Sequence, residues 1–423
     1  MLVPKKYKTV FVILGATGDL STGKIIPALF ELRKKMAHFG ARSPSEAHKR
    51  QDVPFSVVAV SRRPWSDDDF RDFLGRDKYD NDFLQSVHYK TVFFDTCVGS
   101  SELKDFLREI GGKKTKYIFY VSMAPTLYDT ALRCMKKNKL LSVGDSKILV
   151  EKPFGLDLKS SKKLNALALS FLEHKQIYRV DHYLGKEALR ALTEVQEKSD
   201  TLSRIISNKT VASIRVKIFE DFGVKDRGAS YDSVGAFRDV GQNHILQMLA
   251  AIAIKPPRAK YFRENSLRSN IPENISLAPA SWHSARAKVV EALEISKIKI
   301  RRGQYFGYTK EKNVAKDSKT ETFFSLQTYF KSGKLAGVPV VLESGKKMST
   351  REASITVEFK NGETFDILVE GEAYEHILEA AVADKRELFV GSREIFAAWK
   401  FVDVVAKKFS KIPLEIYKPG KIV

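Results

Sequence analysis

The first 180 positions of the chain alternate between two hydrophobic patterns. Short apolar runs rich in β-branched and aromatic residues, which are typical of buried strands, are separated by stretches with the 3.6-residue spacing of helices. We predict strands over residues 9–14, 55–60, 117–122 and 147–150, and helices over residues 24–36 and 126–137. Strands that alternate with helices are typical of a parallel, doubly wound sheet, so this part is predicted to be an α/β domain of the Rossmann type.

The pattern changes after about residue 178. Long strands with period-two alternation follow, and we predict them in "VASIRVKIFE" (residues 211–220), "TFFSLQTYF" (322–330) and "ASITVEFKNGETFDILVE" (353–370). The last of these folds back at Asn361-Gly362, a typical hairpin turn. Helical spacing predicts helices over residues 185–198, 233–254 and 375–408. The sequence therefore predicts two domains, residues 1–178 and 179–423, the second being α+β with a large, mainly antiparallel sheet.

Composition agrees with two cores. At 423 residues with 43% apolar residues, the chain is too long for one ordinary core. Cys97 and Cys134 form no CxxC pair and have no histidine at zinc spacing, so we expect neither a disulfide nor a structural metal, and a reducing cytoplasm fits. The start resembles a short signal peptide, but its apolar run is brief and ends in a glycine turn, which favours a strand. No later segment is long enough to span a bilayer.

The net charge of the chain and its distribution indicate which binding partners to expect. The chain has 72 Lys and Arg against 51 Asp and Glu, a formal net charge of +21. The basic residues occur as doublets spread over the whole length, without the interleaved aromatic residues that stack on bases. This distribution favours a solvated basic surface, so neither a nucleic acid nor a membrane is expected as a partner. A basic surface does attract small phosphorylated ligands.

The first predicted strand leads into a glycine turn. "GATGDL" (residues 15–20) opens a helix, and Gly15 and Gly18 permit a sharp turn and the close approach of a pyrophosphate. The motif departs from GxGxxG and is weak alone. NAD-binding sheets carry an acid after the second strand, whereas Arg62 and Arg63 stand here and favour the 2′-phosphate of NADP. The alternative is that both are ordinary surface charges, and the long gap requires an inserted loop, for which residues 38–54 have the composition.

Two further motifs place polar groups where ligands bind. "EKPFG" (residues 151–155) puts Lys152 at the carboxyl end of a predicted strand, and Pro153 could fix this turn in the cis form. "RVDHYLGKE" (179–187) begins a helix, and its imidazole, phenol, ammonium and backbone amides suit a phosphate. These donors follow Asp181 and belong to His182, Tyr183 and Lys186. Taken singly, each string is more typical of a domain-boundary turn.

A third motif combines an apolar helix with a polar start. "RDVGQNHILQMLA" (residues 238–250) has apolar residues at helical spacing, yet it carries His244 and four other polar side chains in its first turns. A lone histidine at such a place is more often satisfied by a neighbour than catalytic. The accompanying motifs shift this balance towards a site.

These motifs together resemble a known family. With "GVPVVLESGKKMSTREA" (residues 337–353), they occur in the order and approximate spacing of glucose-6-phosphate dehydrogenase, and the stretch from "AYEHIL" to "AAWKF" (373–401) resembles its C-terminal helices. The resemblance implies oxidation of C1 of β-D-glucose 6-phosphate to 6-phosphoglucono-1,5-lactone with NADP. This reaction is the first step of the oxidative pentose phosphate pathway.

The resemblance also implies residue roles. His244 matches the base that takes the C1 hydroxyl proton, which imidazole can do near neutral pH, and Asp181 matches the carboxylate that orients it. The residues that match substrate ligands are Lys152, His182, Tyr183, Lys186, Glu220, Asp239, Lys346 and Arg351. Those that match coenzyme contacts are Gly15, Thr17, Gly18, Leu20, Lys24, Arg62 and Lys152. No metal ion is implied.

Departures from the family pattern leave alternatives open. Gly241 stands where the family has a bulky residue, and we expect it to cost the helix about 1 kcal/mol and to loosen the base. The chain is shorter between residues 362 and 373, so the sheet that joins subunits in the family should be trimmed, and we expect a homodimer at most. The alternatives are a sugar oxidoreductase of the inositol-dehydrogenase type, which lacks the "RVDHYLGKE" motif, and a non-catalytic NADP-binding scaffold.

Overall fold

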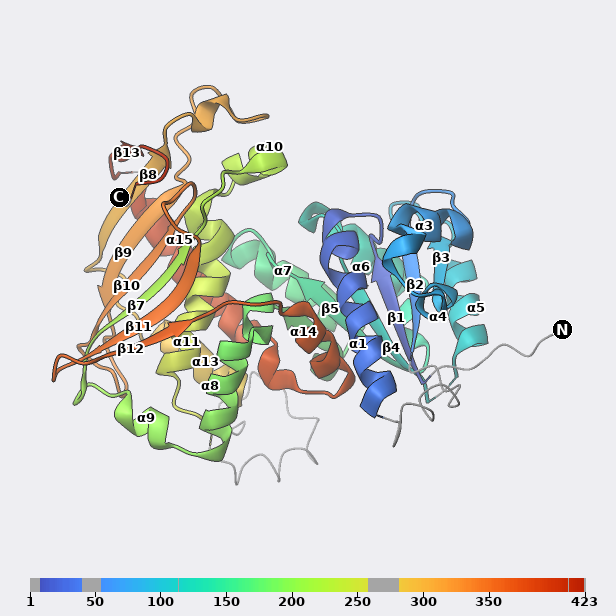
Figure 1. The fold of residues 1–423 in the computed structure, drawn as a ribbon, viewed down its shortest axis with the longest axis horizontal. Coiled ribbons are helices and arrows are strands. Elements are labelled where there is room, and N and C mark those ends of the chain that lie inside the picture. Colours follow the sequence, from blue (N-terminus) through green and yellow to red (C-terminus); the bar gives the residue numbers. More distant parts are fainter. Residues whose placement is uncertain (1–7, 40–54, 113, 258–280, 410, 422–423) are drawn as a thin grey trace. The chain divides into compact units, whose positions relative to one another are not determined.

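The computed structural model describes residues 8–39, 55–112, 114–257, 281–409 and 411–421 (Figure 1). The chain divides into two compact units, the first comprising Met1–Phe154, Lys162–Val180 and Tyr374–Phe389, the second comprising Gly155–Ser161, Asp181–Ala373 and Val390–Val423. The division expected from sequence, after residue 178, assigned Tyr374–Phe389 to the second domain. This segment belongs to the first unit because its apolar face, including Ile377 and Leu378, is buried in the first core.

The first unit contains a six-stranded sheet with the order β3-β2-β1-β4-β5-β6, in which all neighbours are parallel. Its strands are β1 (Thr9–Leu14), β2 (Ser56–Ser61), β3 (Val87–Thr91), β4 (Lys116–Val121), β5 (Asp145–Glu151) and β6 (Ile177–Val180). This is the strand order of a Rossmann fold, so the predicted α/β class is confirmed. The four predicted strands are β1, β2, β4 and β5, and the first coincides with residues 9–14.

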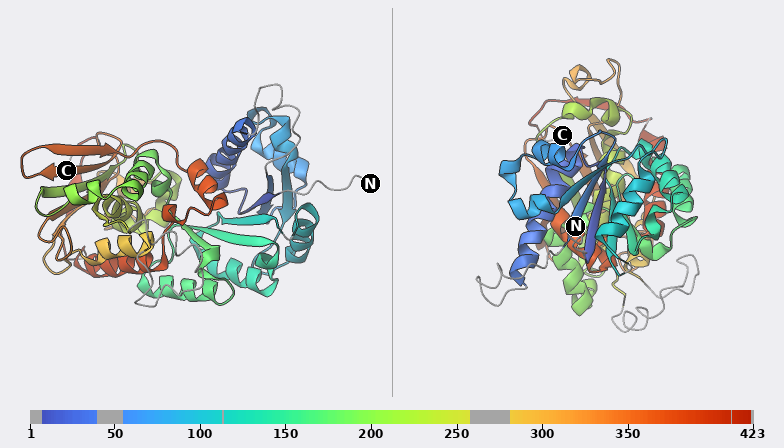
Figure 2. Two further views of the ribbon diagram at one scale, coloured as in Figure 1. Left: turned by 90° about the horizontal axis from the view of Figure 1, so that it is seen from below. Right: turned by 90° about the vertical axis from the view of Figure 1, so that its right-hand side faces the viewer.

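Helices cover both faces of this sheet (Figure 2). They are the π-helix η1 (Ser21–Ile25), α1 (Ile26–Phe39), α3 (Asp67–Leu74), α4 (Asn81–Gln85), α5 (Ser100–Ile110), α6 (Tyr128–Lys137), α7 (Leu158–Leu169), whose first residues belong to the second unit, and α14 (Tyr374–Val382). Short 3-10 helices are η2 (Arg76–Lys78), η3 (Pro125–Leu127), η4 (Leu140–Ser142), η5 (His174–Gln176) and η10 (Arg386–Leu388). The inserted loop expected over residues 38–54 lies outside the described residues from position 40 onward.

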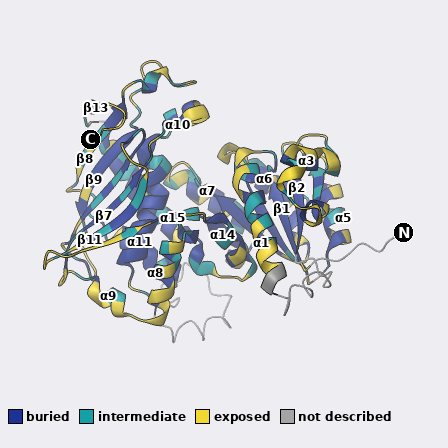
Figure 3. Cartoon of the chain, in the orientation of Figure 1, coloured by how far each residue is buried: buried dark blue, intermediate teal, exposed yellow. Residues whose placement is uncertain are grey.

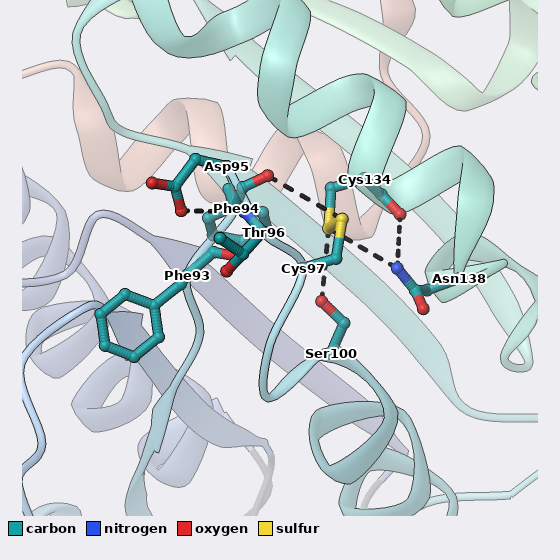
Figure 4. The surroundings of a disulfide bond; sticks show 8 residues. All are labelled: Phe93, Phe94, Asp95, Thr96, Cys97, Ser100, Cys134 and Asn138. Carbon is teal, nitrogen blue, oxygen red and sulfur yellow. Dashed lines mark hydrogen bonds between the residues drawn. A yellow bond between two sulfur atoms is a disulfide. The ribbon is translucent and has the colours of Figure 1, made fainter.

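The two cysteines of the chain are paired, which corrects the expectation from their spacing. Cys97, in the turn after β3, forms a disulfide with Cys134 on α6, and their Cα atoms are 5.6 Å apart (Figure 4). Ser100 Oγ and Asn138 Nδ2 lie 3.3 and 3.6 Å from Cys134 Sγ. The sequence could not indicate this pair because 37 residues separate the two positions and only the fold brings them together. The pairing removes the support that unpaired cysteines gave to a reducing compartment.

The second unit contains a seven-stranded sheet with the order β12-β11-β7-β10-β9-β8-β13. Its strands are β7 (Val211–Phe219), β8 (Lys299–Tyr305), β9 (Phe323–Tyr329), β10 (Pro339–Gly345), β11 (Glu352–Phe359), β12 (Thr364–Leu368) and β13 (Leu414–Tyr417). Four neighbouring pairs are antiparallel, whereas β10 pairs with β7 and β13 with β8 in parallel. The mainly antiparallel sheet is confirmed, and so is the hairpin turn, where Gly362 has φ +87°.

The helices of the second unit are α8 (Glu187–Lys198), α9 (Thr201–Ile205), α10 (Gly228–Asp232), the π-helix η8 (Phe237–Ile245), α11 (Leu246–Ala253), α13 (Trp282–Glu291) and α15 (Ser392–Phe409), with 3-10 helices η6 (His182–Gly185), η7 (Lys225–Arg227) and η9 (Tyr308–Lys310). Burial is concentrated in the strands and in the inward faces of the helices (Figure 3). Within the described ranges, no helix combines the length and apolar character that a bilayer crossing requires.

One helix predicted from the sequence forms two helices in the structure. The stretch over residues 375–408 is interrupted between α14 and α15, where Asp384 has a left-handed φ of +59°. Gly391 lies there too, and a Cβ on it would come within 2.6 Å of the His283 side chain. The helical spacing continues across this break, so the pattern alone did not reveal it.

Candidate active site

The glycine turn after β1 is held tightly against the sheet. Gly15 has φ +87°, and a Cβ there would collide with the carbonyl oxygen of Ser122. The amides of Gly15 and Ala16 donate to the Val60 carbonyl at 2.8 and 3.0 Å, which ties this turn to the end of β2. Gly18 is exposed and its amide donates to the Gly15 carbonyl at 3.1 Å. The turn thus presents backbone with little side-chain cover at the start of a helix, as a pyrophosphate requires.

The cationic residues expected near the coenzyme lie at the same edge of the sheet. Lys24 is exposed on η1, and Thr17 and Leu20 are half-buried in the turn before it. Arg62 is exposed and directly follows β2, while the guanidinium of Arg63 lies 4.8 Å from the Trp65 ring centre. This donor set, with cations in place of an acid after β2, fits a dinucleotide that carries a 2′-phosphate.

Lys152 follows β5 directly, at the carboxyl edge of this sheet. The Lys152-Pro153 bond is cis, the form considered from the sequence. The preceding residue, Glu151, is buried and accepts hydrogen bonds from the Tyr120 hydroxyl at 2.5 Å and from the Lys152 amide at 3.3 Å. A buried carboxylate therefore anchors the backbone from which the Lys152 side chain extends.

The second unit holds a buried histidine–carboxylate pair. His244 Nδ1 lies 2.5 Å from Asp181 Oδ1, and the two residues are only 4% and 2% exposed. Burial alone would raise the pKa of Asp181, but the charge and hydrogen bond of His244, the charge of His182 and the Tyr183 amide outweigh it and lower the pKa. Because a carboxylate only accepts, it fixes the imidazole proton on Nδ1 and leaves the lone pair on Nε2. The geometry suits a general base.

The π-helix η8 positions His244. The Asn243 side chain accepts from the His244 amide at 2.7 Å, and Glu321 Oε1 accepts from the Phe237 amide at the start of the helix at 3.2 Å. Burial raises the pKa of Glu321. Gly241 is buried, and a Cβ on it would lie 2.9 Å from the Phe237 ring and 3.1 Å from Phe324. The space beside Gly241 is therefore occupied by the rings of Phe237 and Phe324.

Two of the three predicted phosphate ligands contact His244, and the third, Lys186, contacts Tyr183. The Tyr183 ring stacks on the His244 ring, with centres 4.2 Å apart. The His182 ring contacts the His244 ring edge-on, with centres 4.5 Å apart. Lys186 Nζ lies 4.9 Å from the Tyr183 ring centre and donates to the Gly371 carbonyl at 3.0 Å. Among the described residues, Asp181, His182 and His244 form the group whose atoms could ligate a metal ion. In this structure, Asp181 and His244 are joined by a hydrogen bond.

A second polar cluster lies at the ends of two neighbouring strands. Glu220 follows β7 and Lys346 follows β10, and because these strands are parallel and paired, the two side chains meet in an ion pair. The Lys346 side chain is only 2% exposed. Its Nζ lies 5.4 and 5.2 Å from the ring centres of Phe222 and Tyr231. The sequence analysis did not select Phe222 or Tyr231, because neither carries a motif and only the fold brings them to Lys346.

Asp239 and Arg351 extend these clusters. Asp239 pairs with Arg227 at 3.5 Å. Burial raises the pKa of Tyr231, and the charges of Asp239 and Glu220 raise it further. Burial also raises the pKa of Tyr183, with Glu220 acting in the same direction and the exposed Arg351 opposing it. The charges of Glu220 and Arg351 thus act on Tyr183, which stacks on His244, and the charges of Asp239 and Glu220 act on Tyr231, which lies beside Lys346.

A Rossmann-type sheet with a pyrophosphate turn, and a second sheet beside a buried His–Asp pair, define the class of dinucleotide-dependent dehydrogenases. Residues 12–191 match the family model "Glucose-6-phosphate dehydrogenase, NAD binding domain", and residues 198–370 match "Glucose-6-phosphate dehydrogenase, C-terminal domain". The chain belongs to the glucose-6-phosphate dehydrogenase family. The resemblance carried by the motifs is thereby confirmed.

Individual proteins that are similar to this chain support the family assignment. Glucose-6-phosphate 1-dehydrogenase of Bacillus subtilis (strain 168) is 33% identical over 379 residues, which cover 84% of this chain and 71% of the relative. The Helicobacter pylori enzyme (strain ATCC 700392 / 26695) is 28% identical over 440 residues and covers 96% of this chain and 94% of its own. A solved glucose-6-phosphate dehydrogenase in complex with its substrate glucose-6-phosphate shares the fold with a TM-score of 0.80, at 24% identity, over 100% of this chain and 96% of that one.

Proposed function

We propose that this chain oxidises C1 of β-D-glucose 6-phosphate to 6-phosphoglucono-1,5-lactone with hydride transfer to NADP, as the first step of the oxidative pentose phosphate pathway. The buried His244–Asp181 pair, in a chain of this family, is the observation that carries the proposal. The inositol-dehydrogenase type and the non-catalytic scaffold are not favoured, because both halves of the chain match the one family.

His244 acts as the general base. Its Nε2 removes the proton of the C1 hydroxyl while the electron pair of the C1–H bond departs as hydride, so that C1–O becomes the lactone carbonyl. Asp181 keeps the imidazole in the required tautomer and stabilises the imidazolium that forms. When bound, NADP supplies the ring that accepts the hydride.

The remaining predicted residues bind the two ligands. His182, Tyr183 and Lys186, with Lys346 and Arg351, donate to the phosphate and the sugar, and Glu220 and Asp239 accept from sugar hydroxyls. The proposed coenzyme contacts are Gly15, Thr17, Gly18, Leu20, Lys24 and Arg62, with Lys152 near both ligands. Arg62→Ala should raise KM for NADP much more than KM for NAD, since only NADP carries the 2′-phosphate. Equal effects would contradict the assignment.

Assembly and location are also proposed. We expect a homodimer at most, because the shorter stretch between residues 362 and 373 is expected to trim the sheet and so to reduce the area for subunit contact. Light scattering that shows a stable tetramer at micromolar concentration would contradict this. The cytoplasm is retained as the proposed location, although the Cys97–Cys134 disulfide is more typical of an oxidising compartment.

The direct test is an assay of the purified chain with glucose 6-phosphate and NADP, followed by the absorbance of reduced nicotinamide. Turnover of glucose 6-phosphate supports the proposal. Turnover of unphosphorylated sugars alone would indicate the inositol-dehydrogenase type. Binding of NADP without turnover of any sugar would indicate a scaffold.

A further inference from the structure

The strand β13 contacts the backbone of a proposed substrate ligand. β13 lies at the edge of the second sheet, parallel to β8, and sequence motifs assign it no role. Its last residue, Tyr417, is only 6% exposed, and its hydroxyl donates to the carbonyl oxygen of Lys346 at 2.6 Å. Lys346 is the buried cation that pairs with Glu220.

Thr322 completes this contact. Its carbonyl oxygen accepts from the Lys346 amide at 2.9 Å, and its hydroxyl lies 2.9 Å from the Tyr417 hydroxyl. The Tyr417 hydroxyl also lies 3.3 Å from the Thr322 carbonyl oxygen, and because its one proton points to the nearer carbonyl of Lys346, the Thr322 hydroxyl donates to Tyr417. The Thr322 hydroxyl also accepts from the Tyr305 amide at 2.9 Å. Both backbone polar groups of Lys346 are therefore fixed by buried partners.

The C-terminal segment around β13 also contacts Lys347, the residue that follows Lys346. The Gly420 amide donates to the Lys347 carbonyl at 2.8 Å, and the Tyr417 carbonyl accepts from the Phe306 amide at 2.8 Å. Lys347 has a left-handed φ of +49°, which is unfavourable for a residue with a side chain. The turn over Lys346 and Lys347 thus depends on bonds from outside itself.

We infer that Tyr417 is a positioning residue for substrate binding, which holds the Lys346 backbone so that its ammonium is aimed at Glu220 and the sugar phosphate. The inference rests on the proposed function, because the role of Lys346 is itself proposed. A long lysine side chain aims its charge only if its backbone is fixed, since freedom there adds to the entropy lost on binding. Tyr417 touches no reacting atom and acts through Lys346.

The test compares two deletions of a buried phenol hydroxyl. Tyr417→Phe should raise KM and the calorimetric Kd for glucose 6-phosphate about five-fold, the usual effect of one hydrogen bond, while kcat stays within about two-fold and KM for NADP is unchanged. Tyr308→Phe is the matched control, because its fully buried hydroxyl donates to Asp232 at 2.9 Å and contacts neither Lys346 nor Lys347. It should lower thermal stability similarly and leave KM unchanged.

A double-mutant cycle separates this inference from the proposed function. Lys346→Ala should raise KM about ten-fold or more, and Tyr417→Phe should then add almost nothing, since the residue it positions is gone. If Lys346→Ala raises KM but Tyr417→Phe does not, the positioning role is overturned and the proposed site stands. If Lys346→Ala has no effect, the substrate assignment fails and the inference fails with it. Thr322→Val, which removes the donor to Tyr417, provides a second variant should Tyr417→Phe not fold, and unchanged KM there would overturn the inference.

Discussion

In its proposed role as general base, His244 requires Asp181 to remain ionised beside it. The pKa of Asp181 is lowered, so this carboxylate stays charged throughout the neutral range despite complete burial. Removing the imidazole leaves substrate binding largely intact but removes the acceptor for the C1 hydroxyl proton. His244→Ala should therefore lower kcat by a factor of about 10² or more, with glucose 6-phosphate affinity within a few-fold, as measured by steady-state kinetics and calorimetry.

The companion variant Asp181→Asn tests the pair as a unit. It should also lower kcat, but add little in the His244→Ala background, because the carboxylate acts through the imidazole. His174→Ala, a histidine of the other unit, is the control and should keep wild-type kcat. A loss of affinity with near-normal turnover in His244→Ala would refute the assignment.

The sequence predicts those site residues that carry their own chemistry within a motif. Asp181 and His182 are adjacent in one motif, and the polar residues at the start of an apolar helix mark the position of His244. Tyr231, Glu321 and Tyr417 lack such signals, because each reaches the site from a distant segment through tertiary packing. Burial and hydrogen bonding, which only the fold supplies, distinguish these residues from ordinary aromatic and acidic ones.

At the scale of elements, β1 with its continuous apolar run was predictable, whereas the edge strands β3 and β13 were not. β1, all six of whose residues are buried, was predicted over its whole length. β3, VHYKT, and β13, LEIY, lie at sheet edges and have only five and four residues, which is too short for the apolar pattern to distinguish a strand from a loop. β13 also joins the sheet in parallel to β8, a pairing that no local turn signal indicates.

The turn between β9 and β10 carries a lysine that should make stability depend on pH. Burial, with the nearby charge of Lys255, lowers the pKa of Lys334 to about 8, and its ammonium donates to the Ser203 carbonyl at 3.3 Å. In the unfolded chain this lysine titrates near 10.5, so wild-type stability should rise between pH 8 and 10.5, where only the unfolded state holds the proton. Lys334→Met should thus be more stable than wild type below about pH 8, by about 1 to 3 kcal/mol.

The measurement is chemical denaturation of both proteins across this pH range. The difference between them should close as pH rises above 10.5, because the wild-type lysine is then neutral in both states. Lys331→Met, at an exposed position of the same turn, is the control and should show no such closing gap. A constant difference at every pH would show that the titration of Lys334 does not contribute.

The disulfide joins the turn after β3 to α6 and should stabilise the first unit. Closing a loop with a sequence separation of 37 residues stabilises by about 4 kcal/mol in the chain-entropy model, and 2 to 4 kcal/mol is typical. Protein purified without reductant should show no titratable thiol in denaturant, and two after reduction. Cys97→Ser with Cys134→Ser should unfold at lower denaturant concentration. Two free thiols in the unreduced, denatured protein would contradict the pairing.

At the scale of the whole molecule, the net charge of +21 and the donors around His244 should act together on a dianionic substrate. His182 and Tyr183 lie in η6, Lys186 is the residue before α8, and Lys346 and Arg351 come from the segment after β10. Free glucose offers these groups no phosphate, so it lacks the charge-assisted hydrogen bonds that the proposed ligands make to a dianion. We therefore expect kcat/KM for glucose to be lower than for glucose 6-phosphate by about 10³ or more.

The dependence of kcat/KM on ionic strength distinguishes recognition of the phosphate charge from recognition of the sugar's shape. At saturating NADP, raising the salt from about 20 to about 200 mM should lower kcat/KM for glucose 6-phosphate through screening, whereas the value for neutral glucose, the internal control, should hardly change. Lys186→Ala should reduce both the preference for the phosphorylated sugar and its salt dependence, because the variant lacks one cation of the phosphate site. Comparable kcat/KM values for the two sugars in the wild-type protein would rule out phosphate recognition by these residues and would favour an enzyme for unphosphorylated sugars.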